Sequence, residues 1–281
     1  MSPPSRQPAG LPFAPAPTKP RPGFPVRLAG LAAPALAAQS APGLPYGRSA
    51  TAAAHDSRPV APVPSGLGLD SSAVRLAMVS RLAAQGLSEP AVLQALAAVE
   101  RHRFVDSALV NQAYEDTSLP IGLGQTISKP SVVGRMLELL IQGRSRPLGR
   151  VLEIGTGCGY QSALLARLAR EVYSLERLRA LHEKARDKLR PLRLHNVHLI
   201  LGDGMLGYPK GAPYDAILSA AGGDSIPQAW LDQLAPGGRL VAPAALASGR
   251  QSLVVIDKTD QGCVQTVLEA VHFVPLKSGL A

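Results

Sequence analysis

The stretch VLEIGTGCGY at residues 151–160 decides the fold. Residues 151–154 form a mainly apolar strand pattern, and the turn that follows carries Gly155, Gly157 and Gly159 before a helical pattern begins. Glycines let the backbone turn sharply and approach a ligand closely. In α/β sheets such turns stand at the carboxyl ends of strands, where ligands bind. The stretch therefore predicts a strand, a ligand-binding turn and a helix.

Strands and helices alternate along the chain on the C-terminal side of this turn. Helices are expected between the strands, at about 160–170, 178–190 and 227–234. Two further apolar runs flank a turn at 257–262 and predict a closing antiparallel hairpin. The alternation predicts an α/β fold with a doubly wound, mostly parallel sheet. Its strands are expected at the short apolar runs 151–154, 172–175, 197–201, 214–220 and 239–243.

Two acids that follow later strands predict a nucleoside ligand. Glu176 ends the second strand, where a carboxylate can accept hydrogen bonds from both ribose hydroxyls. Asp203 follows the third strand and is placed to accept from an adenine amino group, with Gly204 allowing close approach. The glycines are spaced G-x-G-x-G, because Tyr160 stands where the dinucleotide fingerprint has its third glycine. This spacing favours an S-adenosylmethionine pocket over a dinucleotide.

Two more residues of the stretch are expected to belong to the cofactor site. Glu153 lies within the first strand, where its carboxylate could hold the backbone amides of the turn. Thr156 lies in the turn itself, and its neighbour Cys158 is expected to serve only as a small side chain.

The N-terminal quarter of the chain differs from the rest in composition. Residues 1–69 hold 15 of the 26 prolines and show no sustained helical or strand period, which is typical of a disordered segment. We therefore expect a leader over 1–69 and a folded domain over 70–281, and the glycine spacing marks this domain as a methyltransferase domain. That domain is expected to open with helices, the first of which turns one face inward: Leu76, Val79, Leu82 and Ala83. Residues 115–128 are expected to form a loop.

Charge and cysteine usage exclude several classes of protein. Of the net charge of +9, residues 1–69 contribute +5, so the remaining 212 residues carry only +4. A nucleic-acid partner is not expected, because such proteins cluster basic residues on a binding face. Cys158 and Cys263 lie far apart without metal-ligand spacing, which argues against a disulfide framework and a zinc site. No run approaches the ~20 apolar residues of a membrane span, and a cytoplasmic protein is expected.

Several longer motifs then make a family resemblance visible. They are AYEDTSLPIGLGQTISKP at 113–130, VLEIGTGCGYQSALLA at 151–166, GDG at 202–204 and the ending VHFVPLKSGLA at 271–281. Over about residues 70–281 the chain resembles the bacterial protein-L-isoaspartate O-methyltransferases. The segment PIGLGQTIS is the most specific of these motifs. One departure from the family pattern lies at Gly222 and Gly223, on the expected rim of the acceptor site.

The resemblance implies the class I S-adenosylmethionine-dependent methyltransferase fold and a repair activity. It implies methyl transfer to the α-carboxylate of L-isoaspartyl, and also D-aspartyl, residues of damaged proteins by a monomeric enzyme without a metal. Gln125, Thr126 and Ile127 are then expected to border the cofactor, and Ser128 to donate a hydrogen bond to the acceptor carboxylate. An alternative for Ser128 is capping of the helix that begins near Pro130.

The residues leave other functions open. A methyltransferase for RNA or a small molecule would share the cofactor pocket, although LSAAGG at 218–223 lacks the Asn/Asp-Pro-Pro-aromatic motif of amino-group methylation. A nicotinamide oxidoreductase is disfavoured by the glycine spacing. A nucleotide-sensing module with a basic tail is the remaining, non-enzymatic, alternative.

Overall fold

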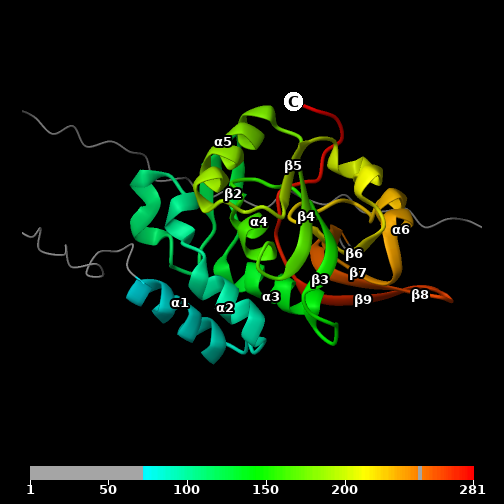
Figure 1. Ribbon diagram of the computed structural model, residues 1–281, viewed down its shortest axis with the longest axis horizontal. Helices are drawn as coiled ribbons and strands as arrows, with labels where there is room; N and C mark the ends of the chain where they lie inside the picture. The colour runs from blue at the N-terminus through cyan, green and yellow to red at the C-terminus, as the bar shows by residue number, and fades with distance from the viewer. Residues whose placement is uncertain (1–71, 246–248) are drawn as a thin grey trace, which may run out of the picture. The chain divides into compact units, whose positions relative to one another are not determined.

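The computed structural model describes residues 72–245 and 249–281. The predicted leader over 1–69 lies outside the described residues, so the domain boundary at residue 70 stays a prediction. A seven-stranded sheet runs in the order β5-β4-β3-β6-β7-β8-β9 (Figure 1). Its strands are β3 (Leu148–Ile154), β4 (Ala169–Glu176), β5 (Val197–Leu201), β6 (Tyr214–Ser219), β7 (Leu234–Ala245), β8 (Gln251–Thr259) and β9 (Gly262–Ala270).

The sheet is parallel from β5 to β7 and antiparallel beyond. β3 pairs in parallel with β4 on one side and with β6 on the other. β8 pairs antiparallel with β7 and with β9, which is the predicted closing hairpin. The chain thus winds first to one side of β3 and then to the other, and ligands bind at such a reversal of strand order. The predicted doubly wound, mostly parallel fold is confirmed.

Helices cover both faces of the sheet. The N-terminal helices and α3 and α4 pack on one face, whereas α6 packs on the other (Figure 1). Val151 faces the first layer and Leu152 the second, as expected for a strand buried on both sides. The helices are α1 (Ser72–Ala84), α2 (Pro90–Ala98), α3 (Pro130–Ile141), α4 (Tyr160–Leu165), α5 (Arg179–Leu189) and α6 (Gln228–Gln233). The 3₁₀ turns are η1 (Arg101–Phe104), η2 (Ser107–Gln112), η3 (Arg190–Leu192), η4 (Gly204–Leu206) and η5 (Pro209–Gly211).

The expected loop at 115–128 is in part a small hairpin. β1 (Leu119–Gly122) pairs antiparallel with β2 (Gln125–Ile127). Leu119 and Ile127 face each other and are buried, at 3% and 5% exposure. The turn between the strands has positive φ at Leu123 as well as at its two glycine neighbours. Strands of three and four residues are too short to give a clear alternation, so the sequence pattern missed them.

The inward face of α1 also differs from the expectation. Leu82 is buried as predicted, but Leu76 is 52% exposed and Ala83 is exposed too. Met78 is the second buried residue of this helix. The apolar residues of α1 are spread around the helix, and packing against α2 and α3 selects which of them is covered.

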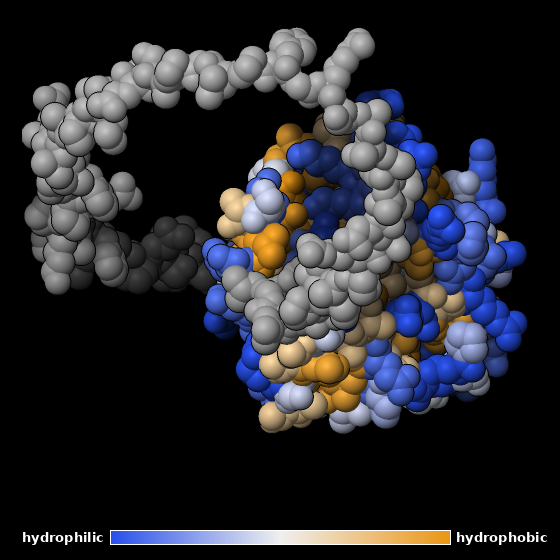
Figure 2. Space-filling view, turned by 60° about the vertical axis from the view of Figure 1, so that its left-hand side comes forward, coloured by the Kyte–Doolittle hydropathy of each residue, from blue (hydrophilic) through white to orange (hydrophobic). Residues whose placement is uncertain are grey.

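Hydrophilic residues cover much of the surface and are interspersed with hydrophobic ones on the face seen in Figure 2. Across the described ranges, none of the helices has the length and apolar character needed to cross a membrane.

Candidate functional site

The glycine turn follows β3 at the reversal of strand order. Gly155, Gly157 and Gly159 all have positive φ, of 89°, 55° and 89°. At Gly159 a side chain is also excluded by space, because a Cβ there would stand 2.8 Å from Leu189 Cδ1. Cys158 is buried, as expected for a small packing residue. The turn therefore depends on glycine for its conformation and, at Gly159, for its contact with the C-terminal end of α5.

Glu176 accepts hydrogen bonds from two backbone amides, one of which belongs to this turn. Its carboxylate accepts from Gly157 N at 2.9 Å and from Leu178 N at 3.0 Å, and the residue is 6% exposed. Each carboxylate oxygen has two lone pairs and can accept further bonds. The side chain at the end of β4 is thus fixed in place and can still accept from a ligand.

Glu153 does not hold the amides of the turn as the sequence predicted. The carboxyl is fully buried, and its Oε2 accepts from Ser174 Oγ at 2.6 Å and from Ser162 Oγ. Thr156 Oγ1 lies 2.6 Å from the same Ser174 hydroxyl. Burial raises the pKa of Glu153 to about 7. Glu153 and the turn residue Thr156 are therefore linked through the Ser174 hydroxyl. The hydrogen bond from a turn amide that was expected at Glu153 is made to Glu176 instead.

Asp203 binds backbone amides on both of its oxygens. Oδ1 accepts from Met205 N at 2.8 Å, and Oδ2 accepts from Gly279 N at 2.6 Å. The C-terminal segment is also paired with Gly222, which donates to Val274 O at 2.9 Å and accepts from Leu276 N at 2.8 Å. One of the two glycines at which the sequence departs from the family pattern thus holds this segment beside the site.

A pocket opens between the glycine turn, Glu176 and the C-terminal segment. Of the residues predicted for the cofactor, it contains Gln125, Gly155, Glu176 and Gly204. At Gly204 a Cβ would stand 2.6 Å from Ile154 Cγ2, and Trp230 Nε1 donates to Gly204 O at 2.7 Å. The remaining lining residues are Ile154, Leu175, Arg177, Leu178, Ala221, Val274, Pro275, Leu276 and Lys277. We refer to this as the cofactor pocket.

The chemistry of the cofactor pocket fits a nucleoside with an attached amino acid. A buried carboxylate stands at one wall, glycine backbone allows close approach at two others, and Ile154, Leu175 and Leu276 supply apolar surface. Such a combination of a few fixed polar groups with apolar walls is typical of small-molecule sites. Sequence reasoning did not predict that residues 274–277 line this pocket, although the ending VHFVPLKSGLA was among the motifs that carried the resemblance.

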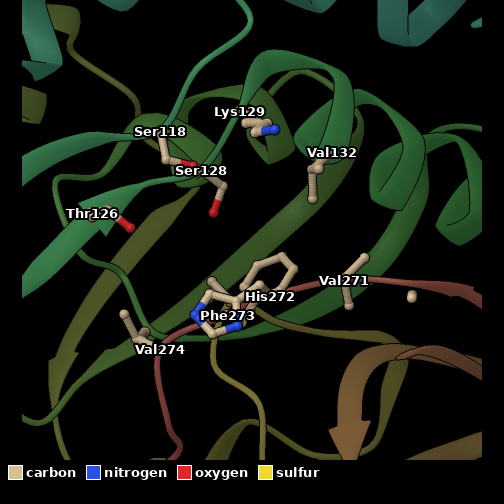
Figure 3. Close-up of a pocket in the computed structure, with 11 residues that line it drawn as sticks. Ser118, Thr126, Ser128, Lys129, Val132, Val271, His272, Phe273 and Val274 are labelled. Carbon is tan, nitrogen blue, oxygen red and sulfur yellow. The ribbon is translucent and has the colours of Figure 1, made fainter. Parts of the chain in front are cut away.

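A second pocket adjoins the first, and Val274 lines both. Figure 3 shows Ser128 and Thr126 on one side of it and His272 and Phe273 on the other, with the Ser128 hydroxyl directed into the space between them. Its other lining residues are Ser118, Lys129, Val132, Ala220, Ala270 and Val271. We refer to this as the acceptor pocket. Ile127, predicted to border the cofactor, instead points into the core, because its strand partner Leu119 does too.

The geometry around Ser128 contradicts the capping alternative. The N-cap position of α3 belongs to Lys129, with no side-chain capping bond. The amide of Ser131, which a capping side chain would serve, donates to Asp116 Oδ1 at 2.8 Å. Ser128 is half-buried, and its hydroxyl makes no hydrogen bond within the described residues. The side chain is therefore available to a ligand.

Within the ranges that the structure describes, no three His, Cys, Asp or Glu side chains are grouped so that they could hold a metal ion.

Comparison with known proteins gives one consistent family. The family model described as protein-L-isoaspartate(D-aspartate) O-methyltransferase matches residues 73–281. The protein-L-isoaspartate O-methyltransferase of Methylibium petroleiphilum is 56% identical over 266 residues, covering 93% of this chain and 97% of that protein. That of Dechloromonas aromatica is 54% identical over 214 residues, or 76% of this chain and 98% of that protein.

Solved structures agree with the sequence relatives. One protein-L-isoaspartate O-methyltransferase superposes with a TM-score of 0.66 at 30% identity, covering 73% of this chain and 67% of that one. A putative protein of the same name from Plasmodium falciparum, solved with S-adenosyl-L-homocysteine, has a TM-score of 0.64 at 24% identity. It covers 72% of this chain and 98% of its own, and it shows the shared fold. The chain therefore belongs to the protein-L-isoaspartate(D-aspartate) O-methyltransferase family.

Proposed function

We propose that this chain transfers a methyl group from S-adenosylmethionine to the α-carboxylate of L-isoaspartyl, and also D-aspartyl, residues in damaged proteins. The observation that supports it best is that the cofactor pocket and the acceptor pocket lie on either side of one residue, Val274, which lines both. A methyl donor in one pocket and a carboxylate in the other would meet there. When bound, S-adenosylmethionine supplies an electrophilic methyl group on a sulfonium.

The residues of the acceptor pocket suit a reaction in which charge disappears. A carboxylate is ionised at neutral pH and needs no general base. An anion and a sulfonium become a neutral ester and a thioether, so a strong cationic clamp would stabilise the reactants more than the transition state. Ser128 offers a neutral donor instead, and Thr126 and Ser118 add hydroxyls to the lining. Lys129 is exposed and contributes long-range attraction for an anion.

In this proposal Ser128 donates a hydrogen bond to the acceptor carboxylate and orients one oxygen toward the cofactor pocket. Val132, Val271 and Phe273 exclude water from the carboxylate, which strengthens that bond. Positioning and desolvation of this kind are the main contributions a site can make when the nucleophile is already charged.

The cofactor roles follow from the carboxylates at the strand ends. Glu176 accepts from the ribose hydroxyls while it keeps the glycine turn in place through Gly157 N. Gly155 and Gly204 permit close approach, and Gln125 lines the cofactor pocket next to Thr126 of the acceptor pocket. Asp203 contributes less than the sequence indicated, because both oxygens already bind amides; its remaining lone pairs can accept from adenine.

We propose that a monomer is active, as the family resemblance implied. Its macromolecular partners are then isoaspartyl proteins and peptides. Cys158 and Cys263 are both free thiols, which fits a reducing cytoplasm.

Calorimetry and a methyl-transfer assay test this function against its alternatives. We expect binding of S-adenosylhomocysteine but not NAD, and transfer of labelled methyl to an isoaspartyl peptide but not to RNA. Binding of NAD, or labelling of RNA with no labelling of the peptide, would refute the assignment. A methyltransferase for RNA or a small molecule is disfavoured because the acceptor pocket is lined by the PIGLGQTIS segment and by residues 271–274.

A further inference from the structure

Arg101 is a fully buried cation in the first position of η1. Its side chain has 0% exposure and lies behind the acceptor pocket, where it binds backbone carbonyl groups of three segments. Nε donates to Ala113 O at 2.8 Å, and Nη2 donates to Ser128 O at 2.8 Å and to Thr117 O at 3.4 Å. These carbonyls lie 12, 16 and 27 residues along the chain. One guanidinium thus ties both ends of the β1–β2 region to η1.

The charge of Arg101 is not matched by an acid in contact with it. Among the described residues it forms no ion pair, and its guanidinium carbon lies 5.0 Å from the ring centroid of Tyr160. Burial lowers the pKa of Arg101. A buried cation without a carboxylate costs free energy that an apolar side chain of similar length would not. The three backbone carbonyls that Arg101 satisfies are therefore what a guanidinium provides at this position.

The contact at Ser128 connects this cation to the acceptor pocket. Arg101 holds the Ser128 carbonyl, while the hydroxyl of the same residue points into the pocket (Figure 3). The direction of a side chain follows from the orientation of its own backbone, so fixing the carbonyl restricts where the hydroxyl can lie. Ser128 stands between the end of β2 and the beginning of α3, where no strand pairing constrains it.

We propose that Arg101 is a positioning residue for methyl transfer: it orients the Ser128 hydroxyl by holding the Ser128 carbonyl, and it does not itself contact the acceptor carboxylate. The inference rests on the function proposed above.

A double-mutant cycle separates this role from a merely structural one. The variants are Arg101→Met, Ser128→Ala and the pair together, assayed for kcat/KM with an isoaspartyl peptide. We expect each single substitution to lower kcat/KM by about 10- to 100-fold, as for the loss of an orienting bond. The kcat/KM of the paired variant should be no more than about 3-fold below that of the less active single variant. The reason is that the effects of two residues that act through one another are not additive. The dissociation constant of S-adenosylhomocysteine should stay within about 2-fold of wild type, because the cofactor contacts lie elsewhere.

Arg144→Met is the matched control. Arg144 also binds two backbone carbonyls, of Gly237 at 2.7 Å and Asp215 at 3.0 Å, but far from both pockets. It should lower the melting temperature while kcat/KM stays near wild type. If Arg101→Met does not fold, Arg101→Lys replaces it in the double-mutant cycle, since lysine keeps the charge and can reach one carbonyl. We then expect the same coupling with Ser128→Ala and smaller losses of kcat/KM.

Three results would overturn the inference: losses that multiply in the paired variant, wild-type kcat/KM in a folded Arg101 variant, or an equal loss in Arg144→Met. A wild-type chain that does not methylate the isoaspartyl peptide would refute the proposed function itself, before any variants are compared. The two failures are therefore distinguishable.

Discussion

Replacing Glu176 by alanine tests the cofactor pocket at the residue that both holds the glycine turn and is proposed to bind the ribose. The carboxylate accepts from Gly157 N and Leu178 N and is proposed to accept from the ribose hydroxyls. Loss of charge-assisted bonds to a ligand costs about 1.5–3 kcal/mol, so the dissociation constant of S-adenosylhomocysteine should rise by about 10- to 100-fold. Glu176→Gln should give an intermediate value, because its amide retains a single acceptor oxygen.

Calorimetric titration measures these constants, at a temperature where thermal melts show each variant folded. The control is Glu171→Ala, which removes a carboxylate from the same strand, β4, where it contacts His198 at 2.7 Å outside the pocket. We expect wild-type affinity in that variant. Unchanged affinity in Glu176→Ala would show that the ribose does not lie against this strand end, and the assignment of the pocket would be wrong.

Three further predictions concern Ser128, Glu153 and the N-terminal residues. Ser128→Ala should lower kcat/KM by about 10- to 100-fold with unchanged cofactor affinity. Ser128→Asp should be folded but inactive, because its carboxylate repels the acceptor carboxylate. A fully active Ser128→Asp enzyme would contradict the role of Ser128 as a donor to the acceptor. The pKa of Glu153 is raised by burial from an ordinary value near 4.5 to about 7, so the folded state binds the extra proton and stability should fall as pH rises across that window. Glu153→Gln should remove this fall. In thermal melts, the melting temperature of the variant minus that of wild type should therefore be higher at pH 8 than at pH 5; an equal difference at both pH values would argue against the raised pKa of Glu153. Deleting residues 1–65 should leave melting temperature and methyl transfer nearly unchanged, because every proposed site residue lies within the region that matches the family; a large loss of either would show that the leader contributes.

The sheet could be predicted from the sequence because its strands are short apolar runs that end in turn residues. β5 was predicted at its observed bounds, and the strand ends at Ile154 and Glu176 placed the glycine turn and the ribose acid correctly in the fold. The β1–β2 hairpin could not be predicted, since only two of its residues are buried and neither strand is long enough to alternate.

The parts of the site that were missed depend on contacts between distant segments. Gly279 lies 76 residues from Asp203, and a backbone amide has no signature in the sequence. The same holds for Arg101, whose partners are carbonyl groups. Glu153 was misassigned for a related reason: its position in the strand was correct, but the donors to its carboxylate oxygen Oε2 are Ser162 and Ser174, not the turn amides.

The most direct test of the account is methyl transfer by the wild-type chain to two peptides that differ only in the linkage at one residue. We predict that the isoaspartyl peptide gains a methyl ester, located by tandem mass spectrometry on its α-carboxyl group, and that the aspartyl isomer gains none. The isoaspartyl carboxylate can enter the acceptor pocket beside Ser128, as proposed above. Equal methylation of both peptides, or an ester at another position, would contradict the proposed function.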